Sequence, residues 1–271
     1  MNRDVVMRLY EVCGNRLLVC DRQGGGEIEN DANNLAKACW DEGRRIADGV
    51  VWFQRNGQEI AFGFVNPDGS VESVCGNGLF AVAHALETGK HSQITLSPAK
   101  HAPADMEINE ATYTLSVPYS LYDQQLIDMP NGGKLYDTGS PHVVMTVSDV
   151  QKAPLHQLGI ETGDRWKANL TMYSFSGSEV RARTFERGVD AETDACGTGA
   201  LAVSIDSWLR GVNRCKILYP GGAYDSHVIK NQGGLTLRLK IRRESICSMG
   251  NIALRSFSSQ EVLDRGLLCS H

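Results

Sequence analysis

Two cysteines occupy the same short setting at two places in the chain. Cys75 begins Cys-Gly-Asn-Gly-Leu-Phe-Ala-Val-Ala and Cys196 begins Cys-Gly-Thr-Gly-Ala-Leu-Ala-Val-Ser, so five of nine positions match without a gap. In each copy the cysteine precedes glycines and an apolar run of helical character. Backbone N–H groups at a helix start can hold a carboxylate and lower the pKa of a thiol. The motifs therefore predict thiol chemistry beside a bound carboxylate, with the two glycines admitting the ligand to the backbone.

A pair of thiols suits the inversion of an α-carbon. Inversion requires removal of a proton from one face and delivery of a proton to the other, which two acid/base groups on opposite sides can perform. A thiolate serves as the base and a thiol as the acid, while the helix starts stabilise the charge that develops on the carboxylate. This chemistry requires no pyridoxal cofactor. We also expect no metal, because the chain contains neither a Cys-x-x-Cys nor a His-x3-His spacing.

The spacing of the motifs predicts how the chain is organised. Cys75 and Cys196 lie 121 positions apart in 271 residues, which is close to half the length. We expect two related lobes, residues 1–128 and 129–255, with the polar stretch 128–134 between them and residues 256–271 completing the first lobe.

Apolar alternation and turn residues predict many strands and few helices. Helical patterns cover residues 31–42, 76–87 and 197–209. The prediction is a strand-rich α+β protein, and its strands include residues 17–20, 49–53, 60–64, 113–117, 142–147 and 235–241.

The composition excludes several classes of partner. A net charge of -5 without a Lys/Arg run gives no basic surface for nucleic acid. No apolar stretch approaches the roughly 18 residues of a membrane span, and the N-terminus lacks the apolar core of a secretory signal. We expect a cytoplasmic protein whose other six cysteines serve packing.

The motifs resemble those of the diaminopimelate epimerase family. Asn66-Pro-Asp-Gly-Ser-Val-Glu-Ser-Val-Cys75-Gly-Asn-Gly is similar to the first-cysteine signature of that family, and Thr193-Asp-Ala-Cys196-Gly-Thr-Gly is similar to the second. Shorter segments follow in the order of that family: Gly14-Asn15, Ala47-Asp48-Gly49, Gly139-Ser-Pro-His142, Glu186-Arg187-Gly188 and Pro220-Gly-Gly.

The resemblance implies a fold and a set of site residues. The fold would be two pseudo-symmetric lobes, each a β-barrel-like sheet around a central helix, with the active site between them and homodimerisation as the assembly. Cys75 and Cys196 would be the catalytic pair acting on a small amino acid. Asn15 would lie near the reacting centre. The backbone of Gly76, Asn77, Gly197 and Thr198 would bind its carboxylate, and Asn66, Asn169, Glu186 and Arg187 would hold the distal end of the substrate.

Departures from the family pattern lie on the substrate side. Arg16-Leu17 follows Gly14-Asn15 where the family has Asp-Phe, and Ser140 replaces an asparagine. Diaminopimelate is the first predicted substrate, because Glu186-Arg187-Gly188 persists and a guanidinium grips a second carboxylate well. A racemase of histidine, lysine or ornithine is the close alternative.

Other classes and simpler roles also fit parts of the pattern. A phenazine-biosynthesis-like isomerase would share the fold but is expected to use a carboxylate base, and a non-catalytic amino-acid-binding protein would not need both thiols. The cysteines could be buried structural thiols. Arg187 could form a surface ion pair with Glu186 or Glu192, and Asn66 could satisfy its own turn.

Overall fold

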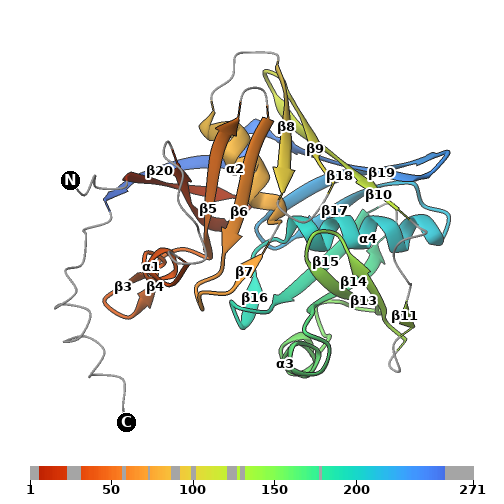
Figure 1. The fold of residues 1–271 in the computed structure, drawn as a ribbon. Coiled ribbons are helices and arrows are strands. Elements are labelled where there is room, and N and C mark those ends of the chain that lie inside the picture. The colour runs from red at the N-terminus through yellow and green to blue at the C-terminus, as the bar shows by residue number, and fades with distance from the viewer. Residues whose placement is uncertain are drawn as a thin grey trace, which may run out of the picture.

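A computed structural model describes most of the chain and shows a strand-rich mixture of α and β structure (Figure 1). Eighteen strands join one hydrogen-bonded sheet, and β3 (Trp40–Asp41) pairs with β4 (Arg44–Arg45) in a separate hairpin. Within the described residues no helix is long and apolar enough to cross a membrane. The described residues are 6–22, 32–56, 59–72, 74–86, 92–98, 102–120, 127–128, 132–176 and 179–253.

The first half of the fold, residues 6–120, follows a fixed order of strand pairings. Neighbouring strands pair antiparallel, parallel, antiparallel, parallel, antiparallel and antiparallel. They are β1 (Val6–Val12), β2 (Asn15–Asp21), β5 (Gly49–Asn56), β6 (Glu59–Val65), β8 (Ser92–Pro98), β9 (Ala104–Ile108) and β10 (Thr112–Tyr119). A short strand, β7 (Val71–Glu72), pairs with β6.

The second half, residues 127–242, repeats the same order of pairings. Its strands are β12 (Lys134–Asp137), β13 (Pro141–Thr146), β14 (Asn169–Ser176), β15 (Glu179–Glu186), β17 (Arg214–Tyr219), β18 (Gly222–Asn231) and β19 (Gly234–Arg242). The short β16 (Ala191–Thr193) pairs with β15 as β7 pairs with β6, and β11 (Ile127–Asp128) pairs antiparallel with β12. The echo in the sequence is therefore an internal repeat of the fold.

One long pairing joins the halves. Strand β10 pairs with β19 over its whole length, from Thr112 opposite Arg242 to Tyr119 opposite Leu235. After a short 3-10 helix (Arg243–Ser245), β20 (Ile246–Ala253) returns to pair with β1. Residues 246–253, which the sequence division assigns to the second lobe, thus pair with the first strand. Residues 256–271 lie outside the described residues, and the lobe boundary and barrel-like closure stay predictions.

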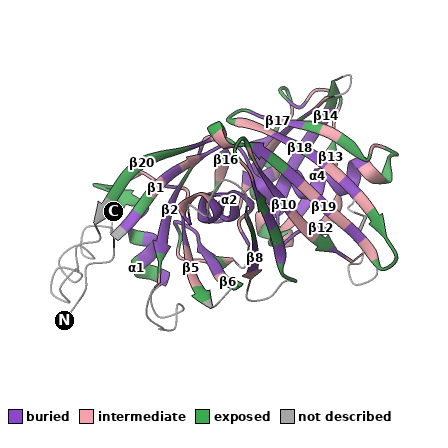
Figure 2. Cartoon of the chain, turned by 90° about the horizontal axis from the view of Figure 1, so that it is seen from above, coloured by how far each residue is buried: buried purple, intermediate pink, exposed green. Residues whose placement is uncertain are grey.

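Each half holds one apolar helix at the centre of its core. Helix α2 (Gly76–Ala85) packs against β1, β2, β5 and β10, and α4 (Gly197–Leu209) packs against β13, β14, β17, β18 and β19. Figure 2 shows α2 buried among these strands, and nearly every residue of both helices is buried. A helix that is apolar on all sides is stable only when it is buried on all sides. The apolar sequences of α2 and α4 therefore explain why strands surround both helices.

Two further helices cover outer faces of the sheet. Helix α1 (Ala32–Lys37) packs against β5 and β6, and α3 (Leu155–Trp166) packs against β14 and β15. The predicted helix over residues 31–42 is too long, because the chain turns at residues 38–39 and Trp40 pairs with Arg45 in the hairpin. Helix α3 is missing from the predicted elements. Gly159 brings it against Phe185, whose ring would meet a Cβ at 2.3 Å.

Candidate active site

The two cysteines occupy equivalent positions at the starts of the central helices. Cys75 is the N-cap of α2 with φ -122° and ψ 115°, and Cys196 is the N-cap of α4 with φ -130° and ψ 112°. Each Sγ accepts a hydrogen bond of 3.4 Å from the backbone N–H three residues on, in Gly78 and Gly199. This is the N-cap geometry of an oxygen side chain, made here by sulfur. The predicted positions at the helix starts are confirmed.

The starts of the two helices touch each other. A Cβ on Gly76 would lie 2.8 Å from the Cα of Gly197, and a Cβ on Gly197 would lie 2.8 Å from the Cα of Gly76. The first glycine of each motif therefore permits the approach of one helix to the other, a reason that the sequence did not reveal. Two helix N-termini, each carrying partial positive charge, converge on one place and suit an anionic group there.

A pocket lies at this junction. Its lining also includes Ser140, which the sequence placed on the substrate side, and Asp48 and Glu72, which the sequence had not assigned to the site. All eleven predicted site residues line it: Asn15, Asn66, Cys75, Gly76, Asn77, Asn169, Glu186, Arg187, Cys196, Gly197 and Thr198.

Two of the predicted asparagines hold the chain that leads into the second cysteine. Asn15 Oδ1 accepts from the backbone N–H of Ala195 at 3.1 Å, and Asn77 Nδ2 donates to the carbonyl of Ala195 at 3.1 Å. Tyr224 donates to Asn77 Oδ1 at 2.5 Å and fixes the orientation of that amide. Both asparagines are buried and belong to the first half. Through these contacts the first half positions Cys196 in the second.

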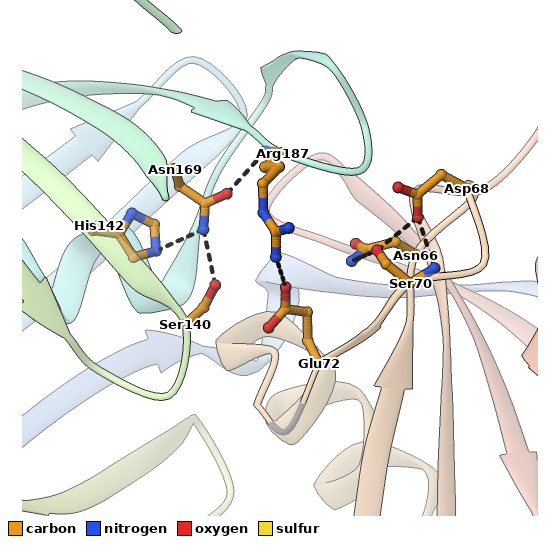
Figure 3. A network of polar contacts seen from close by, with 8 residues as sticks. All are labelled: Asn66, Asp68, Ser70, Glu72, Ser140, His142, Asn169 and Arg187. Carbon is orange, nitrogen blue, oxygen red and sulfur yellow. Dashed lines mark hydrogen bonds and ion pairs between the residues drawn. The ribbon is translucent and has the colours of Figure 1, made fainter. Parts of the chain in front are cut away.

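A polar network connects Ser140, His142, Asn169 and Arg187 (Figure 3). Asn169 Nδ2 donates to Ser140 Oγ at 2.9 Å, and Asn169 Oδ1 accepts from the backbone N–H of Arg187 at 2.9 Å. Ser140, which departs from the family pattern, thus partners the predicted substrate-binding asparagine. The hydrogen bond to Asn169 fixes the backbone of Arg187, from which the side chain extends toward Glu72.

His142 lies between this network and the thiol. Its Nε2 is 2.9 Å from Thr198 Oγ1 and 4.0 Å from Cys196 Sγ, and its Nδ1 is 2.9 Å from Thr171 Oγ1. Burial lowers the pKa of His142 to about 3, so the ring is neutral at physiological pH. Thr198 Oγ1 also contacts the Cys196 sulfur at 3.4 Å. The arrangement orients the thiol by hydrogen bonds without placing a positive charge beside it.

Arg187 pairs with a residue that the sequence did not suggest. Its Nη2 lies 2.8 Å from Oε1 of Glu72, which is 115 residues away in the chain. The two partners expected from the sequence are engaged elsewhere: Glu186 accepts from Thr193, and Glu192 pairs with Arg183. Asn66 does serve its own turn, donating to Ser70 Oγ at 2.9 Å, while it also lines the pocket.

The thiols are neutral in this structure, contrary to the lowered pKa expected at helix starts. Burial, together with the nearby carboxylate of Glu186, raises the pKa of Cys75 to about 12, against the opposing backbone N–H groups of Gly78 and Asn77. Burial and Glu186 also raise the pKa of Cys196 well above its usual value. Burial raises the pKa of Glu186 itself to about 7, although Thr193 and Cys196 donate to it. Both thiols are therefore protonated near neutral pH, and Glu186 is protonated in part.

Several known proteins are similar in sequence to most of this chain. Diaminopimelate epimerase from Aquifex aeolicus is 32% identical over 186 residues, covering 63% of this chain and 67% of that protein. The enzyme of the same name from Nitratiruptor sp. is 31% identical, covering 68% and 76%, and that from Thermotoga maritima is 26% identical, covering 86% and 98%. A scan against protein-family models finds no match.

Solved structures share the fold at lower identity. A probable proline racemase from Agrobacterium radiobacter superposes with a TM-score of 0.70 at 17% identity, covering 95% of each chain. A phenazine biosynthesis protein of the PhzF family from Enterococcus faecalis gives 0.65 at 13% identity, covering 93% of this chain and 99% of that one. These likenesses confirm the strand-rich α/β fold.

Proposed function

The chain belongs to the diaminopimelate epimerase family, and from that premise we propose that it inverts the α-carbon of an amino acid with Cys75 and Cys196 as the two proton-transfer groups. The observation that carries the proposal is the matched pair of N-cap thiols at two touching helix starts. Membership of the family makes the chain an isomerase related to epimerases and racemases. The proposal needs no cofactor, because the chain's own residues supply a base, an acid and the anion site.

The electrostatics of the site allow at most one of the two thiols to be a thiolate at a time. A negative charge on Cys75 raises the pKa of Cys196, so the two do not ionise together. Once one cysteine has lost its proton, its thiolate removes the α-proton on one face while the thiol of the other cysteine delivers a proton to the opposite face. Reversal exchanges the two roles. Glu186, whose carboxylate raises the pKa of both thiols and which itself has a pKa of about 7, can exchange a proton with the site near neutral pH.

The helix starts would stabilise the substrate carboxylate during the reaction. Removal of the α-proton spreads negative charge onto the carboxylate, and preorganised N–H groups at that position lower the barrier. Gly76 and Asn77 begin α2, and Gly197 and Thr198 begin α4. The contact between Gly76 and Gly197 supports this proposal, because it brings the two helix starts together at the pocket that they line. Asn15 and Asn77, which clasp Ala195, would act as positioning residues for Cys196.

Diaminopimelate is the first substrate we propose, from the family and from Glu186-Arg187-Gly188. A specific observation also favours a second candidate, a basic amino acid with one carboxylate. Glu72 already contacts Nη2 of the Arg187 guanidinium at 2.8 Å, so a distal carboxylate must share the guanidinium with Glu72 or displace it. A phenazine-type isomerase or an amino-acid-binding protein gives no reason for thiols at both helix starts.

Incubation of the reduced protein in deuterated water with a panel of amino acids tests the proposal. We expect proton NMR to show loss of the α-proton signal for diaminopimelate, or for lysine and ornithine if the second candidate is right. Absence of exchange with every amino acid tested would overturn the proposed reaction. Exchange confined to amino acids with one carboxylate would overturn diaminopimelate as the substrate and leave the reaction standing.

A further inference from the structure

The ion pair between Glu72 and Arg187 spans the pocket from one half of the fold to the other (Figure 3). Glu72 ends the short strand β7, three residues before Cys75, and Arg187 follows β15 directly. The Glu72 side chain is 18% exposed and that of Arg187 is 36% exposed. Both residues line the pocket, so any substrate that reaches Arg187 also meets the Glu72 carboxylate.

Negative groups outnumber positive ones in the described lining. Asp48, Glu72 and Glu186 contribute three carboxyl groups, and Arg187 contributes one guanidinium. Glu186 lines the pocket with both cysteines and raises the pKa of each, so it belongs to the reacting centre. Glu72 is the carboxyl group beside Arg187. Burial raises the pKa of Glu72, and the positive charge of Arg187 opposes the rise. Burial therefore disfavours the negative charge on Glu72, and a further positive group placed beside it would stabilise that charge.

The chemistry at the distal end of the substrate decides how well it fits this pair. A distal carboxylate alone must share Arg187 with Glu72, which contacts its Nη2, or displace Glu72 from it, and in either case it lies beside a second negative charge. A distal ammonium can bind the Glu72 carboxylate while Arg187 stays paired. An end that carries both groups replaces both partners, with the ammonium on Glu72 and the carboxylate on Arg187, and leaves no charge unpaired.

We propose that Glu72 is a specificity-determining residue that binds a distal ammonium of the substrate and rejects amino acids whose side chain ends in a carboxylate alone. This inference rests on the proposed function, because it concerns the substrate of the same site. Diamino acids are the substrate class, with or without a distal carboxylate. The internal repeat supports a special role for this position, since its equivalent three residues before Cys196 is Thr193, which donates to Glu186 instead.

Three substrates of matched chain separate the two distal groups. Diaminopimelate carries both, 2-aminopimelate lacks the distal amine, and lysine lacks the distal carboxylate. We measure kcat/KM for α-proton exchange with each. The wild type should prefer diaminopimelate to 2-aminopimelate by at least about 100-fold, because a site built to bind a polar group strongly rejects an analogue that lacks it. Glu72→Gln should reduce this ratio at least 10-fold, by weakening exchange with diaminopimelate and freeing Arg187 for 2-aminopimelate. Lysine exchange should fall as well.

Glu107→Gln is the matched control. It also removes a carboxylate paired with an arginine, Arg238 Nη2 at 3.3 Å, and Glu107 is exposed and lies outside the pocket lining. Glu107→Gln should leave the ratio unchanged. Glu72→Asp, which keeps the charge on a shorter side chain, gives a second test if Glu72→Gln does not fold, and it should lower the ratio several-fold.

The outcomes distinguish this inference from the proposed function. An unchanged ratio in a folded Glu72 variant, or an equal loss with all three substrates, would make Glu72 a structural link and overturn its role in recognition. Wild-type exchange confined to amino acids without a distal amine would do the same while upholding the reaction. Only absence of exchange with every amino acid would overturn the reaction itself.

Discussion

Gly76→Ala tests the contact that brings the two helix starts together. The added Cβ would lie 2.8 Å from Cα and C of Gly197 and 2.9 Å from the backbone nitrogen of Thr198. Ordinary contact begins at 3.4 Å, so the helix starts must separate by about 0.6 Å. All three obstructing atoms belong to the backbone, and no side chain can rotate away. We therefore expect the upper part of the range for overpacking, about 3 kcal/mol lost from the free energy of unfolding.

The same displacement should impair proton transfer. The helix starts carry both thiols and the proposed carboxylate site, and a misplacement approaching 1 Å can cost on the order of 100-fold in rate. We expect at least about a 10-fold loss of α-proton exchange from a displacement of this size. Urea unfolding followed by tryptophan fluorescence measures the stability, and proton NMR in deuterated water measures the exchange.

Gly233→Ala is the control for this substitution. Gly233 has no neighbouring heavy atom within 4 Å of a Cβ, so alanine should be tolerated there, with a change in stability of less than about 1 kcal/mol. If Gly76→Ala matched Gly233→Ala in both stability and exchange, the helix starts would not meet as described.

Two further substitutions test the buried charges. Glu186 has a pKa of about 7 in the fold against 4.5 as its ordinary value, so the folded state binds more protons than the unfolded state between these values and loses stability as the pH rises through them. Because Glu186 keeps some solvent contact, we expect Glu186→Gln to gain about 2 kcal/mol of stability relative to the wild type between pH 5 and pH 8. A stability difference in urea unfolding that does not change with pH would contradict this expectation. Asp206→Ala should cost about 4 kcal/mol in the same assay, because Tyr136 and Tyr173, each donating to Asp206 at 2.6 Å, lose a buried acceptor; the exposed Asp225→Ala should change little, and equal effects would refute this account of Asp206.

The sequence predicts most of the elements that carry the thiols because their signals are local. A cysteine before two glycines and an apolar run marks a helix start in a few residues, and the two copies reveal the repeat. Helix α3 lacks such signals, since it begins after Pro154 without a side-chain cap and contains Gly159 and Gly163. Its formation depends on packing against β14 and β15, which no local pattern reports.

The contacts within the site lie beyond what one sequence reveals. Glu72 lies within the first-cysteine motif, between Asn66 and Cys75, but its partner Arg187 is 115 residues away. The motif therefore does not reveal the ion pair. The hydrogen bonds of Asn15 and Asn77 to the backbone of Ala195 likewise join segments that are distant in the sequence. The raised thiol pKa values follow from burial, a property of the assembled halves that overrides the local effect of a helix start.

Inversion in deuterated water by the two cysteine variants tests the central claim most directly. Starting from one stereoisomer, the wild type should incorporate deuterium into the inverted product and little into the remaining substrate at early times, because each thiol carries a single proton. Cys75→Ala and Cys196→Ala should each reduce inversion at least about 100-fold, while Cys247→Ala, an exposed thiol, should not. Normal turnover by either pocket variant, or deuterium entering substrate as fast as product, would contradict a mechanism with one thiol on each face.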